Sequence, residues 1–245
     1  MTEVAAMAKL IALTGSPDSG KTVNGIKLAQ EIYEMTKRRV IFLCPDLTVP
    51  VMGYLFPHSR DDDLQSLGMA LDHTDIYKED VLRRIVTVKT MSDFGYLGFK
   101  AGENKYTYPR PTEDKILQLT SVLLQVAEYV VADCDSDPSE LISAVLKTEA
   151  NTTLRFVMPD VKSMAYFASN GDTVEAATKR LTVLSTKDRD IFLPVEEVKA
   201  HFGDVRFTLP YCAELKKQAY CGTLSEPLPD KQYRGILNDI AKAVI

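Results

Sequence analysis

Metal-binding and cross-linking residues are scarce in this sequence. It has only three histidines and four cysteines among 245 residues. The cysteines form no CxxC pair and the histidines show no metal-ligand spacing, so nothing indicates a zinc site or a disulfide framework. Reduced thiols are the simplest interpretation, and we expect a cytoplasmic protein.

Long apolar runs and an excess of basic charge are also missing. No segment approaches the length of a membrane-spanning helix, and the apolar run at residues 10–13 is too short for a signal peptide. The net charge is −5, with a pI near 5.3, which argues against a nucleic-acid-binding surface. Residues 230–244 form an amphipathic pattern whose polar face includes acidic residues, so we predict packing against the domain rather than membrane binding.

The remaining composition is that of an ordinary globular protein. Hydrophobic residues make up 45% of the chain and charged residues 26%, and the length suits a single α/β domain over residues 1–245. Apolar runs that predict strands alternate with helical patterns such as 21–37 and 112–127. These runs lie at residues 9–14, 39–43, 85–88, 129–132, 154–157, 181–184 and 205–209.

Alternating strands and helices predict an α/β fold of three layers. The sheet is expected to be mostly parallel, with helices on both faces and ligands at the carboxyl ends of its strands. Residues 92–111 contain several glycines and a Pro-Arg-Pro run, and we predict a long surface loop there.

A phosphate-binding loop joins the first predicted strand to the first predicted helix. The segment matches GxxxxGK[ST] at every fixed position and has the strand–loop–helix context that this motif requires. Its glycines let backbone N–H groups curl around phosphate, and the helix N-terminus favours negative charge. The residues that we expect to bind nucleotide are Gly15, Ser16, Pro17, Asp18, Ser19, Gly20, Lys21 and Thr22.

Within this loop, two side chains have distinct predicted roles. Lys21 is expected to reach the β- and γ-phosphates and act in catalysis, while the Thr22 hydroxyl is expected to bind magnesium.

Two aspartates follow predicted strands and complete the candidate site. Asp133 ends the run at 129–132, where a carboxylate can join Thr22 in holding magnesium. Asp46 follows the second predicted strand, and it either orients a water for attack on the γ-phosphate or serves as a turn residue. For Asp137 we favour capping of the next helix.

The order of these elements resembles the ParA/MinD-type ATPases, the deviant Walker A (SIMIBI-class) branch of P-loop NTPases. The resemblance implies that Asp46 is the switch I aspartate and Asp133 the Walker B aspartate, and that Pro210 and Tyr211 face the base. It also implies ATP as ligand, with GTP left open, together with magnesium, a homodimer in the ATP-bound state and an unknown protein partner.

The sequence departs from that family where hydrolysis is concerned. The signature lysine after the first loop glycine is replaced by Ser16, and the run after Asp133 lacks the family's glycine. Members without the lysine include the TadZ/CpaE-like proteins, the nearest analogy. A lysine or arginine from elsewhere in the chain could substitute, and the candidates are Lys162, Lys187 and Arg189.

We therefore expect an ATP- and magnesium-binding switch that positions or recruits a partner, with slow or absent hydrolysis. Two alternatives stay open: a degenerate P-loop scaffold, and a small-molecule kinase or ATP-dependent ligase. The sequence leaves undecided the cargo, the base preference, the nucleotide dependence of dimerisation and the role of residues 92–111.

Overall fold

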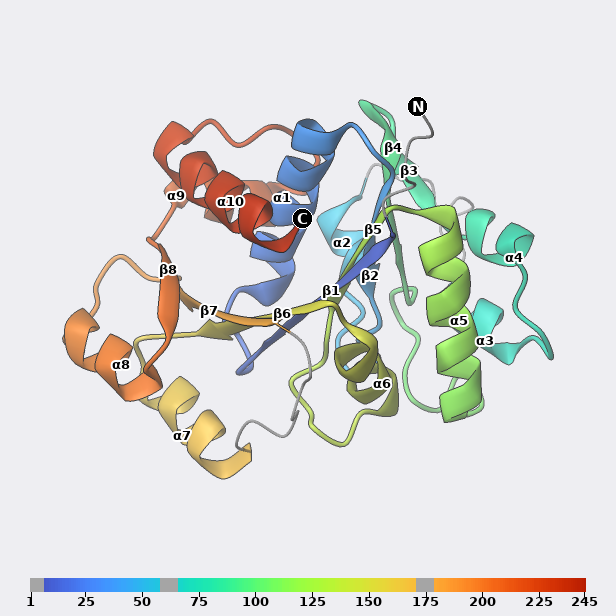
Figure 1. The fold of residues 1–245 in the computed structure, drawn as a ribbon, viewed down its shortest axis with the longest axis horizontal. Coiled ribbons are helices and arrows are strands. Elements are labelled where there is room, and N and C mark those ends of the chain that lie inside the picture. Colours follow the sequence, from blue (N-terminus) through green and yellow to red (C-terminus); the bar gives the residue numbers. More distant parts are fainter. Residues whose placement is uncertain (1–6, 58–65, 171–178) are drawn as a thin grey trace.

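The strands form one sheet in the computed structural model, which describes residues 7–57, 66–170 and 179–245 (Figure 1). Its eight strands run in the order β3-β4-β2-β5-β1-β6-β7-β8, and every neighbouring pair is parallel except β3 with β4. The strands are β1 (Lys9–Gly15), β2 (Val40–Cys44), β3 (Val86–Val88), β4 (Met91–Gly98), β5 (Tyr129–Asp133), β6 (Thr152–Val157), β7 (Lys179–Ser185) and β8 (Val205–Leu209).

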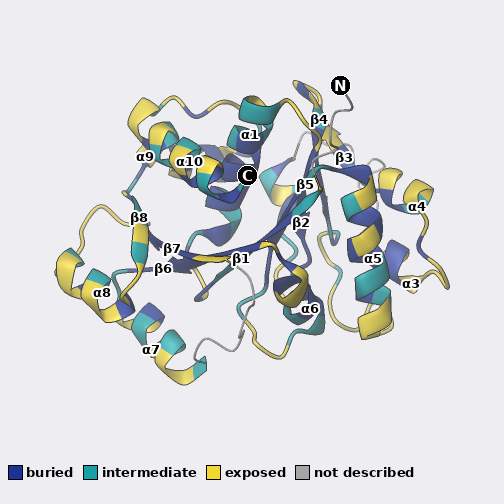
Figure 2. Ribbon diagram, viewed as in Figure 1, coloured by how far each residue is buried: buried dark blue, intermediate teal, exposed yellow. Residues whose placement is uncertain are grey.

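Helices cover both faces of this sheet, which confirms the predicted three-layer α/β fold (Figures 1 and 2). One face carries α1 (Lys21–Thr36), α2 (Met52–Leu55), α9 (Ala213–Cys221) and α10 (Lys231–Val244). The other carries α3 (Leu67–Asp72), α4 (Lys78–Leu82), α5 (Glu113–Val126), α6 (Leu141–Glu149), α7 (Val161–Asn170) and α8 (Val195–Phe202).

Side-chain alternation along the central strands divides the core between the two faces. In β1, Ile11 and Leu13 pack with α1 and α10, whereas Leu10 and Ala12 pack with α5 and α6. Because both faces are covered, the strand reads as a continuous apolar run rather than an alternating one. The register also pairs Leu13 with Asp133, so the phosphate loop and Asp133 leave the sheet at the same edge.

The C-terminal helix packs against the sheet and α1, as its amphipathic pattern predicted. Its apolar face buries Tyr233, Leu237, Ile240 and Val244. The N-cap is Asp230, whose carboxylate accepts from the backbone N–H of Tyr233 at 2.9 Å. Among the described residues, no helix combines the length and apolar character that a membrane crossing requires.

The predicted loop at 92–111 is wrong for its first third, because β4 lies inside the sheet between β3 and β2. Two glycines that suggested a loop are there for close packing. A Cβ at Gly95 would lie 2.4 Å from a methyl carbon of Ile85, and one at Gly98 would lie 2.9 Å from the Cys44 carbonyl oxygen. The loop proper begins at Phe99 and leads to the N-cap of α5.

Candidate functional site: a nucleotide cleft

The phosphate loop curls between β1 and α1 through two residues with left-handed backbone. Asp18 and Gly20 both adopt left-handed φ angles, of 62° and 78°. Gly20 is the N-cap of α1 and makes no side-chain cap, so the first N–H groups of the helix are left for an anion. A Cβ at Gly15 would lie 2.5 Å from the Phe156 carbonyl oxygen, so the loop start requires glycine.

Lys21 is held across the loop by three acceptors. Its Nζ donates to the Ser136 Oγ at 2.6 Å and to the carbonyl oxygens of Gly15 and Ser16, each at 3.3 Å. The Ser136 hydroxyl in turn donates to the Gly15 carbonyl at 2.8 Å. The ammonium group therefore lies over the loop, where a phosphate oxygen can replace these neutral acceptors.

Thr22 and Asp133 meet beneath the loop as predicted from their strand and helix positions. The Thr22 hydroxyl donates to Asp133 Oδ2 at 2.5 Å. Burial raises the pKa of Asp133 to about 6, against the opposing effects of the Lys21 charge and the Thr22 hydrogen bond.

The surroundings of Asp133 fit a magnesium ion. The carboxylate is buried, and its Oδ1 has no hydrogen-bond partner among the described residues. Magnesium prefers hydroxyl, carboxylate and phosphate oxygens, and Thr22 with Asp133 offers two of these. A divalent cation here would also offset the cost of burying the negative charge.

Asp46 forms a turn, which is one of the two roles that its sequence position left open. Its Oδ1 accepts from the backbone N–H groups of Thr48 and Val49, at 2.7 and 2.8 Å, so it does form a turn. The same carboxylate lines the cleft near Asp135, and burial raises its pKa. It shares this lining with Lys21, Thr22 and Asp133.

The loop opens into a cleft of about 1070 Å³, large enough for a nucleotide. Beyond the phosphate region, Asn24, Ser185 and Tyr233 line it together. Asn24 donates to the Ser185 Oγ at 3.3 Å, and the Tyr233 hydroxyl donates to Asn24 at 2.5 Å. At the rim, the Tyr211 ring lies 5.7 Å from the ammonium of Lys216.

Most of the predicted nucleotide-binding residues line this cleft, but not all do. The lining includes Pro17, Asp18, Ser19, Gly20, Lys21, Thr22, Asp46, Asp133 and Tyr211. Gly15, Ser16 and Pro210 are not part of it. Gly15 and Ser16 contribute carbonyl oxygens to Lys21 instead, and Pro210 is exposed at the end of β8.

The three candidate substitute cations lie in different places. Lys187 lines the cleft, and the Arg189 guanidinium lies 6.0 Å from the Tyr211 ring centre. Lys162 forms an ion pair with Asp18 at 2.8 Å.

The segment after Asp133 is tied down by hydrogen bonds rather than freed by a glycine. The Tyr166 hydroxyl donates to the Ser136 carbonyl at 2.7 Å, and the Asp135 N–H donates to Ser143 Oγ at 2.8 Å. The predicted cap at Asp137 is wrong: it closes a turn with Ser139, and Glu140 caps α6. Pro138 and Ser139 form a turn before the helix, closed by the Glu140 N–H, which donates to the Asp137 carbonyl at 3.2 Å.

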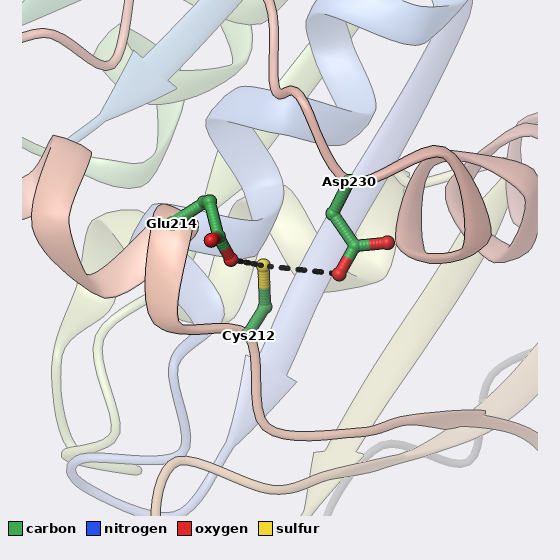
Figure 3. Close-up of side chains that lie close together, drawn as sticks. All are labelled: Cys212, Glu214 and Asp230. Carbon is green, nitrogen blue, oxygen red and sulfur yellow. Dashed lines mark hydrogen bonds between the residues drawn. The ribbon is translucent and has the colours of Figure 1, made fainter.

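A thiol and two carboxylates lie close together at Cys212, which lines the cleft (Figure 3). The Cys212 Sγ lies 4.0 Å from a Glu214 oxygen and 3.8 Å from an Asp230 oxygen. Asp230 caps α10, and Glu214 lies in the first turn of α9. The helix N-termini, which favour negative charge, therefore account for the presence of both carboxylates here. Burial raises the pKa of Cys212, so the thiol is a protonated donor between them.

Comparison with known proteins identifies the fold. No protein-family model and no curated protein sequence matches the chain. Among solved structures, a ParA family ATPase from Chlorobium tepidum superposes with a TM-score of 0.79 at 11% identity, covering 96% of this chain and 98% of that one. The cell-division protein MinD of Pyrococcus horikoshii, complexed with Mg-ADP, gives 0.74 at 16% identity over 97% and 96%.

This chain has the ParA/MinD fold. An ATP complex of an McdA variant from Cyanothece also matches, with a TM-score of 0.68 at 12% identity over 98% of this chain and 97% of that one. The ParA/MinD resemblance drawn from the phosphate loop and the strand order is thus confirmed at the level of fold.

Several residues of the cleft were missed by sequence reasoning. Ser136 follows Asp133 closely, and its place beside the carboxyl edge of β5 could have suggested contact with the phosphate loop. Asn24 and Tyr233 carried no such signal, because their contact joins the first and last helices across 209 positions of sequence.

Proposed function

We propose that this chain is a nucleotide-dependent switch that binds ATP with magnesium and recruits or positions a protein partner. The observation that carries the proposal is the convergence of Lys21, Thr22 and Asp133 at one sheet edge, with a buried Asp133 oxygen left unpaired among the described residues. A scaffold that had lost nucleotide would gain nothing from a buried, destabilising carboxylate at this place.

Each residue has a defined task when Mg-ATP is bound. Lys21 exchanges Ser136 and the loop carbonyls for phosphate oxygens, and the N–H groups of the loop and of α1 surround the phosphates. Thr22 and Asp133 would hold magnesium, which supplies positive charge to the β- and γ-phosphates. Asp46 orients a water, and Tyr211 borders the base.

Hydrolysis is proposed to be slow. The loop position that holds a lysine in typical members is Ser16, whose side chain is buried and donates to Ser163 Oγ at 3.2 Å. No cation can extend from there toward a transferring phosphoryl group, and such a cation contributes orders of magnitude to the rate. The slow turnover keeps the ATP-bound state long-lived, which suits a protein that recruits a partner.

Withdrawal of Lys21 from Ser136 gives the switch its physical basis. Ser136 also binds Gly15 and, through its carbonyl, Tyr166 of α7, so nucleotide binding changes a network that reaches the protein surface. We propose that ATP thereby favours a homodimer and the recruiting state, in a reducing cytoplasm consistent with four free cysteines.

The experiment is sedimentation of the purified protein with Mg-ATP, Mg-ADP or EDTA, with phosphate release measured on the same samples. The expected result is self-association with Mg-ATP alone and phosphate release far slower than one per second. Lys21→Ala should abolish the association. Identical sedimentation in all three conditions, or rapid turnover without association, would count against the switch.

A further inference from the structure

The crest of the phosphate loop carries a negative charge. Asp18 lines the cleft with a left-handed φ of 62°, beside the place that a triphosphate must occupy. Two like charges a few ångströms apart repel, and in an exposed site this repulsion weakens anion binding appreciably at low salt. A phosphate loop with Asp18 alone would therefore work against its own ligand.

A lysine from another element neutralises this carboxylate. Lys162, in the first turn of α7, places its Nζ 2.8 Å from Asp18 Oδ2. The hydrogen bond from Lys162 is the main cause that lowers the pKa of Asp18, while Lys187 and Lys21 add smaller Coulombic effects. Both partners are largely exposed, with 61% of the lysine side chain and 64% of the aspartate side chain accessible.

The position of Lys162 is fixed by its neighbour, Ser163. The Ser16 hydroxyl donates to Ser163 Oγ at 3.2 Å, and this buried oxygen also accepts from the Met158 N–H at 3.0 Å. The Ser163 N–H donates to Asp160 Oδ1 at 2.7 Å. The start of α7 is thus bound to the phosphate loop at Ser16, two residues before Asp18.

We propose that Lys162 is a positioning residue of the nucleotide site, which cancels the charge of Asp18 so that the loop accepts a polyphosphate. The lysine acts through Asp18 and does not itself touch the ligand. The inference rests on the proposed function and names a residue outside the phosphate-loop motif that sets affinity. Ser16 takes part indirectly, because its hydrogen bond to Ser163 ties the start of α7, and with it Lys162, to a loop that lacks the signature lysine.

The test is the affinity for Mg-ATP of the wild type, Lys162→Met, Asp18→Asn and the double variant, titrated at low and at high salt. Lys162→Met should bind about 5–10-fold more weakly at low salt, and the difference should shrink at high salt. Asp18→Asn should bind at least as tightly as the wild type. The double variant should return to within about twofold of the wild type, because both charges are gone.

A matched control is available at another surface pair. Lys242 and Asp239 in α10 form an ion pair at 3.2 Å with side-chain exposures of 60% and 66%, close to those of the Lys162 pair. Neither residue lines the cleft, so Lys242→Met removes the same charge and should leave affinity unchanged.

Two results would overturn the inference while leaving the proposed function standing. One is a wild type that binds Mg-ATP together with a Lys162→Met variant whose affinity for Mg-ATP equals that of Lys242→Met. The other is a double variant as weak as Lys162→Met, which would mean that the lysine contacts phosphate directly. A wild type without affinity for Mg-ATP would refute the proposed function, and this inference with it.

Discussion

The buried charge of Asp133 should destabilise the metal-free protein, and replacing this residue by asparagine should raise the free energy of unfolding. Burial raises its pKa from the ordinary 3.8 to about 6, so the folded state binds the proton more tightly than the unfolded chain does. This cost is close to zero below pH 4, grows mainly between pH 4 and pH 6, and levels off at about 3 kcal/mol near pH 7. Asp133→Asn removes the charge and keeps an oxygen that can accept from Thr22.

The assay is thermal unfolding in EDTA at pH 5 and pH 8. At pH 8 the variant should be more stable by about 1–3 kcal/mol, or roughly 3–10 °C in Tm, and at pH 5 the gap should narrow. Mg-ATP should reverse the order, because only the wild type binds the metal tightly. Asp75→Asn, at an exposed aspartate outside the cleft, is the control. A variant that is less stable than the wild type at pH 8 would refute the reasoning.

Three further predictions concern packing, titration and the Lys21 contacts. Gly25→Ala should lower the free energy of unfolding in urea by about 1–3 kcal/mol, because the new Cβ would lie 2.3 Å from a Leu13 methyl carbon. Gly235→Ala has open space around the new Cβ and should raise the free energy of unfolding by about 0.5–1 kcal/mol. Equal effects of the two substitutions would contradict this. Burial lowers the pKa of Lys27 to about 7, so stability should rise between pH 7 and 10, and this rise should be missing in Lys27→Met. Ser136→Ala should tighten Mg-ATP binding a few-fold, because Lys21 loses a competing acceptor; weaker binding would show that Ser136 contacts the nucleotide.

The features that sequence could predict are those set by local pattern. The phosphate loop was recognisable because strand, glycines, Lys21 and helix follow one another without interruption. Asp133 was predicted for a similar reason, since parallel strands bring their carboxyl ends to one edge. The mostly parallel sheet follows from the alternation of strands and helices, whereas the order of the strands in the sheet does not.

The features that were missed depend on contacts between distant segments. The sequence predicts a loop where β4 lies, because glycines such as Gly95 and Gly98 usually mark turns, and the Ile85 and Cys44 atoms that require them come close only in the fold. The sequence predicts the cap of α6 at Asp137, three residues before Glu140, because the turn after Asp137 leaves no clear pattern in the sequence.

Side-chain direction was likewise beyond the sequence. The sequence shows that Ser16 replaces the family's lysine. It does not show that Ser16 faces inward to Ser163, or that Lys162 reaches Asp18. These contacts depend on how α7 packs beside the loop.

The central claim is that this cleft binds Mg-ATP, and calorimetric titration of the purified protein tests it most directly. The account predicts saturable ATP binding that requires magnesium and is weakened about 100-fold or more by Lys21→Ala, since charge-assisted bonds to phosphate are lost. A wild type that shows no magnesium-dependent affinity for ATP or GTP, or an Lys21→Ala variant that binds as tightly, would contradict it.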